Sequence, residues 1–474
     1  MTLRPTQSSI FSMVKSGILR NQARLLRAQE MLSSGKRILR PSDDPYGAAK
    51  ALTLRGHLSA LESYRSAALG SQPAMQLAAS SLEQGSSIIG DAKSLILQGL
   101  NGTLSAEDRT SLAMELKIQL EQLLDVSNTT LGSEHLFAGS EVSGPAFALS
   151  GSTGYVYQGS DAAPSIEIGK GIRTETLVTG KETFAKFEYS GISFSGLTGL
   201  ARGVRANEGT GFEYLTLRHD ATSGAPGAGV SLANGGADDT ILGSHTLTID
   251  GVAGTVTLDG GGLLAIPQPG DPDFTNFVVT NELGAEVHLD FTGYTGGSST
   301  STLDGQGSVS IDGVNFTALT LTETDLQLIN GSSGSVVHVD ATQVHRAGVE
   351  LVSFDGAANV FDAVLGAIQD LENGHDLDAD EMAARLEMRL GEIDRNHNNL
   401  LRSVSILGAR LGRIESTLGK IDGVATGLAS HLSQVEDADL ASVVMDASQA
   451  EQAMQIAQMA GSRLMQNTLL NFLR

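Results

Sequence analysis

Four acidic side chains near residue 380 have the spacing of a calcium-binding loop. Asp376, Asp378, Asp380 and Glu387 stand at positions one, three, five and twelve of an EF-hand loop, where carboxylate oxygens bind Ca²⁺. The sixth position of such a loop requires glycine for its sharp turn, and this chain has Glu381 there. We therefore interpret these residues as the solvated start of a helix, with Asp378 and Glu381 as capping residues.

The other residues that could do chemistry form no recognisable catalytic or metal set. The stretch 235–238, Gly-Gly-Ala-Asp, is similar to a calcium β-roll repeat, but its fourth residue is wrong and no tandem copies follow. His397 lies on an apolar helical face, which favours a hydrogen-bonded core histidine over a pH switch. The chain has neither an HExxH pair, a GxxxxGK[ST] loop nor a GxSxG elbow. We predict that the protein is not an enzyme and holds no metal or cofactor.

The composition excludes several classes of function. The 474 residues include no cysteine, which excludes disulfides, thiolate metal sites and thiol nucleophiles. The net charge of −23 argues against general binding to nucleic acid or to an anionic membrane. The start of the chain lacks the hydrophobic core of a signal peptide, and no run of 18 apolar residues is present. We expect a soluble protein that, if exported, does not use an ordinary signal peptide.

One long helix is predicted near the C-terminus. From Leu386 to Ile421, apolar residues recur in alternating steps of four and three, and His397 is the single polar member of the series. This spacing is typical of a helix with one narrow apolar seam. At about 1.5 Å per residue the helix is about 54 Å long. Such a helix cannot bury its seam alone, so it requires partner helices of similar length.

Similar seams occur at both ends of the chain. The N-terminal seam residues are Phe11, Val14, Ile18, Asn21, Leu25, Ala28 and Leu32, and the C-terminal ones include Leu440, Val443, Ala450, Met454, Gly461 and Leu464. Asn21 is a polar residue that can fix the register of paired helices. The first helix is basic and the last is acidic, so we expect the two to face each other.

Turn residues separate the predicted helices. Gly35 suits the end of the first helix. A corner follows at Pro41-Ser-Asp43-Asp44-Pro45, with Asp44 as N-cap and Pro45 as the first residue of a helix to about residue 68. We expect a break at Pro73, then a seam rich in small residues over 75–99 and a capped helix over 105–128. A glycine-containing link is expected after residue 421.

The middle of the chain has a different texture. From about residue 139 to 345 it is rich in Gly, Ser and Thr, with short alternating runs separated by Gly, Asp-Gly and Asn-Gly. These features indicate β-hairpins. A weak internal repeat relates 247–252, Leu-Thr-Ile-Asp-Gly-Val, to 309–314, Val-Ser-Ile-Asp-Gly-Val. The repeat allows the region to be built from two hairpin units.

Together these patterns predict a multidomain α+β fold. A long coiled-coil-like helical bundle is built from both chain ends, with a β-rich, Gly- and Asp-rich insert in the middle. We expect three domains: a terminal helical domain (1–40 with 435–474), a helical rod domain (41–144 with 345–434) and a β-rich outer domain (145–344).

Several motifs at the two ends resemble the flagellin superfamily. They are the stretches 32–47 (Leu-Ser-Ser-Gly-Lys-Arg-Ile-Leu-Arg-Pro-Ser-Asp-Asp-Pro-Tyr-Gly), 101–105 (Asn-Gly-Thr-Leu-Ser), 128–130 (Asn-Thr-Thr), 136–139 (Leu-Phe-Ala-Gly), 157–159 (Tyr-Gln-Gly), 408–415 (Gly-Ala-Arg-Leu-Gly-Arg-Ile-Glu), 436–440 (Glu-Asp-Ala-Asp-Leu) and 469–473 (Leu-Leu-Asn-Phe-Leu). The Pro-Ser-Asp-Asp-Pro corner and the Phe-Ala-Gly turn look like the members that join hook and filament. Filament flagellins usually show Lys-Asp-Asp-Ala and Phe-Asn-Gly.

The resemblance implies a structural role in the bacterial flagellum. It implies type III export in a partly unfolded state and assembly through terminal helices, including Leu469 and Phe472, that order on assembly. The implied position is a ring between hook-associated protein 1 and the flagellin filament, outside the cell. The implied partners are those two proteins, further copies of the chain and a flagellar export chaperone.

Two alternatives to the junction role remain open at this point. One is a flagellin filament subunit with an expanded outer domain. The other is a surface adhesin or secreted enzyme whose chemistry resides in the β insert, which would require a pocket with convergent polar groups. The apolar seams can also be the core of a monomeric bundle, because spacing does not distinguish contacts within a chain from contacts between chains.

Overall fold

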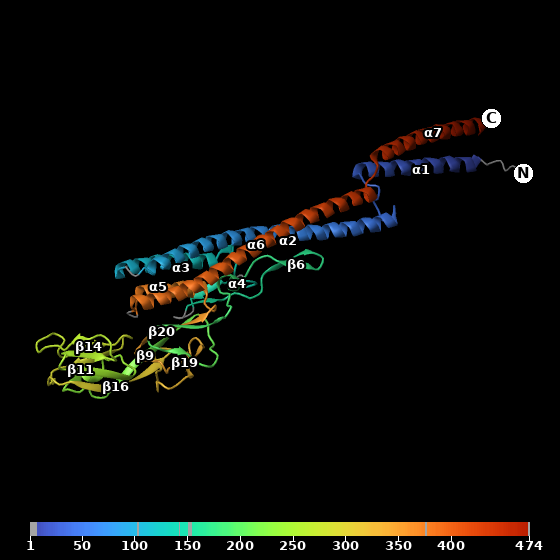
Figure 1. The fold of residues 1–474 in the computed structure, drawn as a ribbon. Coiled ribbons are helices and arrows are strands. Elements are labelled where there is room, and N and C mark those ends of the chain that lie inside the picture. Colours follow the sequence, from blue (N-terminus) through green and yellow to red (C-terminus); the bar gives the residue numbers. More distant parts are fainter. Residues whose placement is uncertain (1–6, 102–103, 142, 150–153, 375–376, 473–474) are drawn as a thin grey trace. The chain divides into compact units, whose positions relative to one another are not determined.

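The computed structural model describes residues 7–101, 104–141, 143–149, 154–374 and 377–472 (Figure 1). Helices occupy both ends of the chain. They are α1 (Gln7–Ser34), α2 (Pro45–Gly99), α3 (Ala106–Ser127), α4 (Gly180–Phe184), α5 (Val360–Glu372), α6 (Ala379–Glu436) and α7 (Leu440–Phe472), with a 3-10 turn, η1 (Ala233–Gly236).

Strands fill the middle of the chain. They are β1 (Thr130–Leu131), β2 (Glu134–His135), β3 (Phe147–Leu149), β4 (Tyr155–Tyr157), β5 (Ser165–Gly169), β6 (Ile172–Glu175), β7 (Gly191–Ser195), β8 (Ala201–Arg202), β9 (Phe212–Ser223), β10 (Ser231–Leu232), β11 (Gly243–Asp250), β12 (Thr255–Leu258), β13 (Leu264–Ala265), β14 (Phe277–Thr280), β15 (Glu286–Asp290), β16 (Ser299–Ser310), β17 (Thr317–Ala318), β18 (Leu326–Ile329), β19 (Val336–Asp340) and β20 (Gly348–Asp355). The predicted multidomain α+β fold, with helical ends and a β-rich middle, is confirmed.

The chain divides into two compact units. One comprises Met1–Ser71, Ile166–Thr174 and Gly412–Arg474, and the other comprises Gln72–Ser165 and Glu175–Leu411. The first unit contains α1, α7, the start of α2 and the end of α6. The second contains the remaining helices and the large sheet. Helices α2 and α6 contribute to both units.

The expected break at Pro73 does not occur. Helix α2 is 55 residues long and continues through this residue without a break. Proline removes one backbone hydrogen bond from a helix interior, but Pro73 is exposed, so water can solvate the carbonyl that loses its partner. On the opposite face, Ala68, Met75 and Ala78 are fully buried. Packing on both sides of the proline therefore outweighs its local cost.

The expected link after Ile421 is also absent, because α6 continues to Glu436. Gly423 and Gly427 lie inside this helix at exposed positions. Each costs about 1 kcal/mol relative to alanine, which is too little to end a helix that is held on both sides. Neither Gly423 nor Gly427 therefore marks the C-terminal end of α6, which is at Glu436.

The seam of α6 is buried at every seventh residue. Leu386, Ile393, Leu400, Leu407 and Ile414 are fully buried, whereas the alternating seam positions are half-buried. In the second unit, small residues of α2 allow close approach of this seam: a Cβ atom added at Gly85 would lie 3.3 Å from Leu400 Cδ1. The predicted coiled-coil-like packing is present here.

The large sheet of the second unit is antiparallel. Its strand order is β13-β12-β11-β16-β9-β20-β7, with β17 paired to β16. The central pair joins two twelve-residue strands, β9 and β16, with a register shift at Gln306/Gly307. Two three-stranded sheets, β10-β15-β14 and β18-β19-β8, accompany it. Both copies of the Ile-Asp-Gly-Val repeat lie at hairpin turns, after β11 and after β16.

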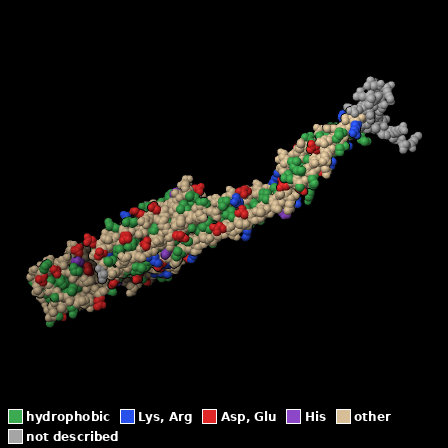
Figure 2. Space-filling view, turned by 90° about the horizontal axis from the view of Figure 1, so that it is seen from above, with side chains coloured by type: hydrophobic (Ala, Val, Ile, Leu, Met, Phe, Trp, Pro, Cys, Tyr) green, Lys and Arg blue, Asp and Glu red, His purple; other side chains and the backbone are tan. Residues whose placement is uncertain are grey.

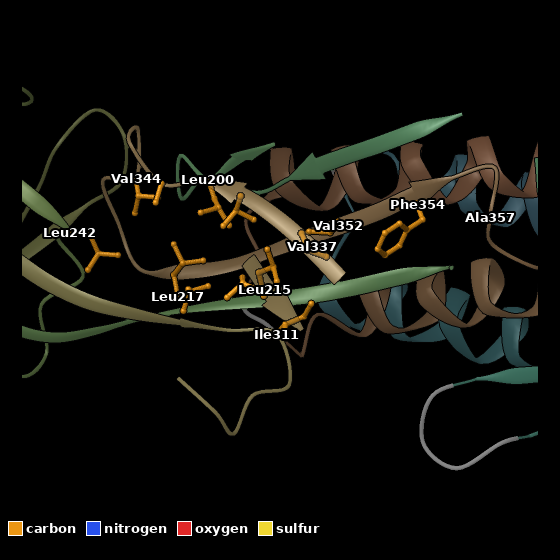
Figure 3. Close-up of a cluster of buried hydrophobic side chains, with 14 residues drawn as sticks. Leu200, Leu215, Leu217, Leu242, Ile311, Val337, Val344, Val352, Phe354 and Ala357 are labelled. Atoms are coloured by element: carbon orange, nitrogen blue, oxygen red, sulfur yellow. The ribbon is translucent and has the colours of Figure 1, made fainter. Parts of the chain in front are cut away.

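Two apolar clusters fill the β region. One gathers around Leu215, Val337 and Phe354, close to the helices (Figure 3). The other gathers around Leu247, Val287 and Phe291. Every expected short run of alternating residues lies in or overlaps a strand, because alternation buries one face of each strand.

Candidate assembly site

Helices α1 and α7 form an antiparallel pair, with their chain ends at the same end of the pair (Figure 1). Ala28 of α1 and Val443 and Ala450 of α7 are buried. Val14 lies against Gly461, because a Cβ atom added there would be 3.5 Å from Val14 Cγ1. All five residues belong to the three-four seams of these helices, so the seams face each other.

The predicted assembly residues differ in exposure. Val443 is buried; half-buried are Val14, Ile18, Asn21, Leu25 and Met454; exposed are Phe11, Leu32 and Leu440. The side chains of Leu464, Leu469 and Phe472 lie outside the described residues. The pair therefore covers the middle of its seam and leaves apolar residues toward its ends open.

A second set of apolar side chains, which the seam analysis missed, lies on the outer faces of the pair. Leu19 and Leu26 of α1 are 55% and 54% exposed. On α7, Val444, Met445 and Met459 are 53%, 60% and 59% exposed. Near the grey atoms in Figure 2, hydrophobic and Lys or Arg side chains are visible on the surface. The seven-residue spacing of Leu19 and Leu26 is the signal that could have revealed this face.

The charges of the two helices do not pair with each other. Among the described side chains of α1 and α7, no ion pair joins one helix to the other. Arg20 and Arg24 of α1 and Asp446 and Glu451 of α7 are exposed. The expectation that the acidic helix faces the basic one is therefore met by apolar contact alone, and these charges are available to other molecules.

Two chain segments run side by side where the pair joins the rest of its unit. The Arg37 N–H donates to the carbonyl of Glu436 at 2.6 Å, and the Ala438 N–H donates to the carbonyl of Gly35 at 2.9 Å. The Arg37 guanidinium also donates to the carbonyl of Val435 at 2.9 Å. These hydrogen bonds cross nearly the whole sequence, so they fix the exit of α1 and the entry of α7 together.

The carboxylate of Glu436 is the charged centre of this link. Its side chain is 5% exposed, and Oε1 accepts from Lys36 Nζ at 2.8 Å and from the guanidinium of Arg55. Two cations from the N-terminal part of the chain therefore hold one buried anion from the C-terminal part. The sequence assigned no role to Glu436 beyond its place in a motif, because the pairing spans 381 residues.

The predicted corner is organised by Asp43. Its Oδ2 accepts from the N–H groups of Leu39 at 3.1 Å and Arg40 at 2.9 Å. The Arg40 N–H is the main cause that lowers the pKa of Asp43. The guanidinium of Arg27 contacts Oδ1 at 3.1 Å, which ties the last turns of α1 to the corner. Pro41 lies on the exposed outside of the turn.

Asp44 and Pro45 begin α2. The Gly47 N–H donates to Asp44 Oδ1 at 2.9 Å, and this bond is the main cause of the lowered pKa of Asp44. Pro45 is the first helical residue, where its missing N–H costs nothing. Gly35 has φ +71°, the left-handed conformation that ends α1. The five corner residues thus stop one helix and start the next.

The isolated chemical candidates have structural roles. His397 Nε2 lies 2.8 Å from Ser86 Oγ, and burial lowers the pKa of the imidazole. The N–H of Glu381 donates to Asp378 Oδ1 at 2.8 Å, so the capping interpretation is confirmed. Asp376 lies outside the described residues. These side chains stabilise helices and do not converge on a common pocket.

The described residues provide neither a metal-binding cluster nor a membrane-spanning helix. Among them, no group of three or more His, Asp, Glu or Cys side chains is arranged to hold a metal ion. Within the same ranges, no helix is both long and apolar enough to cross a bilayer.

Comparison with known protein families finds matches at both ends of the chain. The bacterial flagellin N-terminal helical region matches residues 8–141, and the bacterial flagellin C-terminal helical region matches residues 390–473. The flagellin of Salmonella typhimurium is 25% identical over 509 aligned positions, which cover 97% of this chain and 96% of that protein.

Local similarity is higher to another group of flagellar proteins. Flagellar hook-associated protein 3 of Escherichia coli is 37% identical over 124 residues, or 26% of this chain and 39% of that protein. The Salmonella typhimurium protein of that name is 34% identical over 29% of this chain and 44% of its own length. The chain thus spans less than half the length of these two relatives. The crystal structure of Xanthomonas campestris FlgL aligns with 80% of this chain and 99% of its own, at 16% identity and a TM-score of 0.43.

Proposed function

Because the chain belongs to the flagellin superfamily, we propose that this flagellar structural protein forms the adaptor ring between hook-associated protein 1 and the flagellin filament. The observation that carries the assembly role is the α1–α7 pair, whose seam is buried in the middle and open toward its ends. Isolated helices with an uncovered apolar face are marginally stable. Neighbouring subunits that cover this face would stabilise the pair.

The junction position is favoured by local features. The Pro41–Pro45 corner and the turn at 137–139 look like those of hook-associated protein 3. Over matches of similar length, identity is 37% to that protein of Escherichia coli and 32% to the flagellin of Clostridium tyrobutyricum. In this role the chain would contact hook-associated protein 1 on one side, flagellin on the other and further copies of itself within the ring. A flagellar export chaperone would hold the chain before export.

The domain boundaries follow from the same proposal. The terminal domain (1–40 with 435–474) would assemble through the twelve assembly residues of its helices, and the structural corner at 35–45 would join it to the rod. The rod domain (41–144 with 345–434) would support it. The outer domain (145–344) would face the medium.

A filament subunit is the second candidate. The specific observation in its favour is the match to Salmonella flagellin along 97% of this chain. A filament subunit would use the same terminal helices but would be present along the whole length of the flagellum.

Immunogold electron microscopy of intact flagella separates the two candidates. The antibody is raised against residues 190–344, which belong to the outer domain. A single labelled band where hook meets filament is the result expected for the junction protein. Label along the whole filament would instead identify a filament subunit, and label elsewhere on the cell with none on flagella would refute both.

A further inference from the structure

One edge of the large sheet is open to a further strand. Strand β7 is the last strand of this sheet, and among the described residues β20 is its single strand partner. Its sequence, Gly-Ile-Ser-Phe-Ser, contains no charged residue and no proline, although these are residues that keep other chains away from a sheet edge. The outward N–H and C=O groups of β7 are therefore available to an added strand.

A groove with a volume of about 550 Å³ lies between this edge and helix α6. Ser193, Ser195 and Asp355 line it on the sheet side. Ala384 and Gly391 line it on the helix side, seven residues apart, so they lie along one line of α6. All of these residues belong to the second unit. Because Ala384 and Gly391 are small, a peptide backbone has room to come close to the helix.

The sheet side of the groove has hydroxyl groups that lack partners. Ser195 is 8% exposed, and its Oγ forms no hydrogen bond with a described residue. On β20, Ser353 is opposite Ser193 and is 1% exposed, and its Oγ is also unpaired among the described residues. Ser193 itself donates to Asp355 Oδ2. A buried polar group without a partner is unfavourable, so the Ser195 hydroxyl indicates a place where a bound molecule completes the hydrogen bonding.

The charges at the groove favour a basic occupant. Glu387 is exposed on the helix side and forms no ion pair with a described residue. Asp355 adds a second carboxylate on the sheet side. Arg395 also lines the groove, but its guanidinium is paired with Glu392 at 3.0 Å. The unpaired carboxylate of Glu387 would attract a Lys or Arg side chain.

We propose that β7 and α6 form a docking groove for an extended segment of a separate, basic polypeptide. The segment adds to the edge of β7 as a further strand, so that its backbone pairs with the outward N–H and C=O groups. Alternate side chains point to one side of the added strand, where small residues fit against Ala384 and Gly391. A Lys or Arg of the segment reaches Glu387, and a polar group of the segment pairs with the Ser195 hydroxyl.

A polypeptide fits this groove better than the other occupants. A sugar or another small molecule would leave the row of backbone groups on β7 without partners. A second copy of the chain is disfavoured, because a net charge of −23 on each copy opposes their approach. The binding activity is separate from the assembly role of the terminal helices, and it does not depend on where the chain is in the flagellum.

Selection of short peptides from a random library displayed on phage tests the groove in the full-length protein. The library is first depleted on Gly391→Leu and then selected on the wild type. A Cβ atom at position 391 would lie 3.8 Å from Arg395 Nη2, an ordinary contact, and leucine favours a helix over glycine. The leucine therefore fills the groove without disturbing α6. We expect selected peptides with a Lys or Arg among alternating small residues, which bind the wild type at least about tenfold more tightly than Gly391→Leu.

Matched variants locate the contact by isothermal titration calorimetry with a selected peptide. Gly408→Leu, at a position of α6 with no atom within 4 Å of an added Cβ, should bind as the wild type does. Glu387→Arg should weaken binding by about tenfold or more, and replacing the basic residue of the peptide by Glu should restore it. Hydrogen exchange should slow at the amides of 191–195 when the peptide binds and stay unchanged at 264–265, on the opposite edge of the sheet.

Several results would overturn the proposal. They are a library that yields no enriched peptide, peptides that bind the wild type and Gly391→Leu equally, and protection that appears away from 191–195. A wild-type dimer that Gly391→Leu abolishes, seen by sedimentation velocity without peptide, would make a second copy the occupant and would also refute it. The antibody labelling of flagella tests the junction role by a different surface, so either proposal can fail while the other stands.

Discussion

Glu350 should make the stability of the β region depend on pH. This residue lies on β20 and is 2% exposed. Burial raises its pKa from 4.5 to about 8, although the charge of Arg385 acts in the opposite direction, and Glu381 adds to the rise. Its Oε2 has no hydrogen-bond partner among the described residues. The side chain is therefore held as a neutral acid at physiological pH.

The direction of the effect follows from proton linkage. The folded state keeps the proton up to about pH 8, whereas the unfolded chain releases it near pH 4.5. Stability from this group is complete below pH 4.5, falls as the pH rises and is lost above about pH 8. The difference of about 3.5 pKa units corresponds to about 5 kcal/mol over the whole window. Between pH 6 and pH 8 the loss is about 2 kcal/mol, or about fiftyfold in the opening equilibrium.

Hydrogen exchange compares the wild type with Glu350→Gln, whose amide does not ionise. Protection of the amides of 348–355 is measured for both proteins at the same pH, so that the intrinsic exchange rates cancel. The ratio of variant to wild-type protection should rise about fiftyfold between pH 6 and pH 8. Glu387→Gln, at an exposed position on α6, serves as the control and should leave the ratio unchanged. A ratio for Glu350→Gln that is constant across this range would refute the reasoning.

Three further predictions concern the helices. Leu400→Ala, at a fully buried seam position, should lower the free energy of unfolding by about 2–5 kcal/mol. The control Leu401→Ala, at a side chain that is 44% exposed, should change this free energy by less than about 0.5 kcal/mol. Urea denaturation followed by circular dichroism measures both. Asp44→Ala removes the N-cap of α2 and should cost about 1 kcal/mol, which a thermal melt against the wild type detects. Deletion of 438–474 should leave a soluble, folded protein that no longer joins the filament, and normal incorporation seen by electron microscopy would contradict the assembly role.

The helices were predictable because their apolar seams repeat over many turns. What spacing could not give was where each helix ends. Pro73 and Gly423 are local signals against a helix, but each acts over one or two residues. The packing of α2 and α6 acts over their whole lengths, so it overrides these signals.

The sheet was predictable only in part. Alternation located the short strands, but it does not say which strands pair. Strand β16 pairs with β9, about 85 residues away, and with β11 on its other edge. The register of each strand pair depends on side chains that are distant in the sequence and on bulges such as the one at Gln306/Gly307. Neither the pairing partners nor the positions of bulges can be read from the alternation of residues in a single sequence.

The charged residues inside the protein were the least predictable. Arg385 and Arg389 of α6 directly precede the seam residues Leu386 and Leu390. From the sequence alone, an arginine beside an apolar seam is expected to face solvent. Both are fully buried. The guanidinium of Arg389 is paired with Asp370 at 2.9 Å and lies 3.8 Å from the centre of the Phe212 ring. The partners come from α5 and β9, so this face became buried only through tertiary contacts.

The same spacing has different consequences in α6 and in the terminal helices, and exposure explains why. The heptad positions of α6 from Leu386 to Leu407 are fully buried within the chain, so that seam needs no other molecule. The pair α1–α7 has one interface, and beyond it Phe11, Leu19 and Ile456 are more than half exposed. A helix pair with apolar residues on both faces gains stability from each neighbour that covers the second face. Under the proposed assembly role, ordering of this pair would accompany the addition of a subunit.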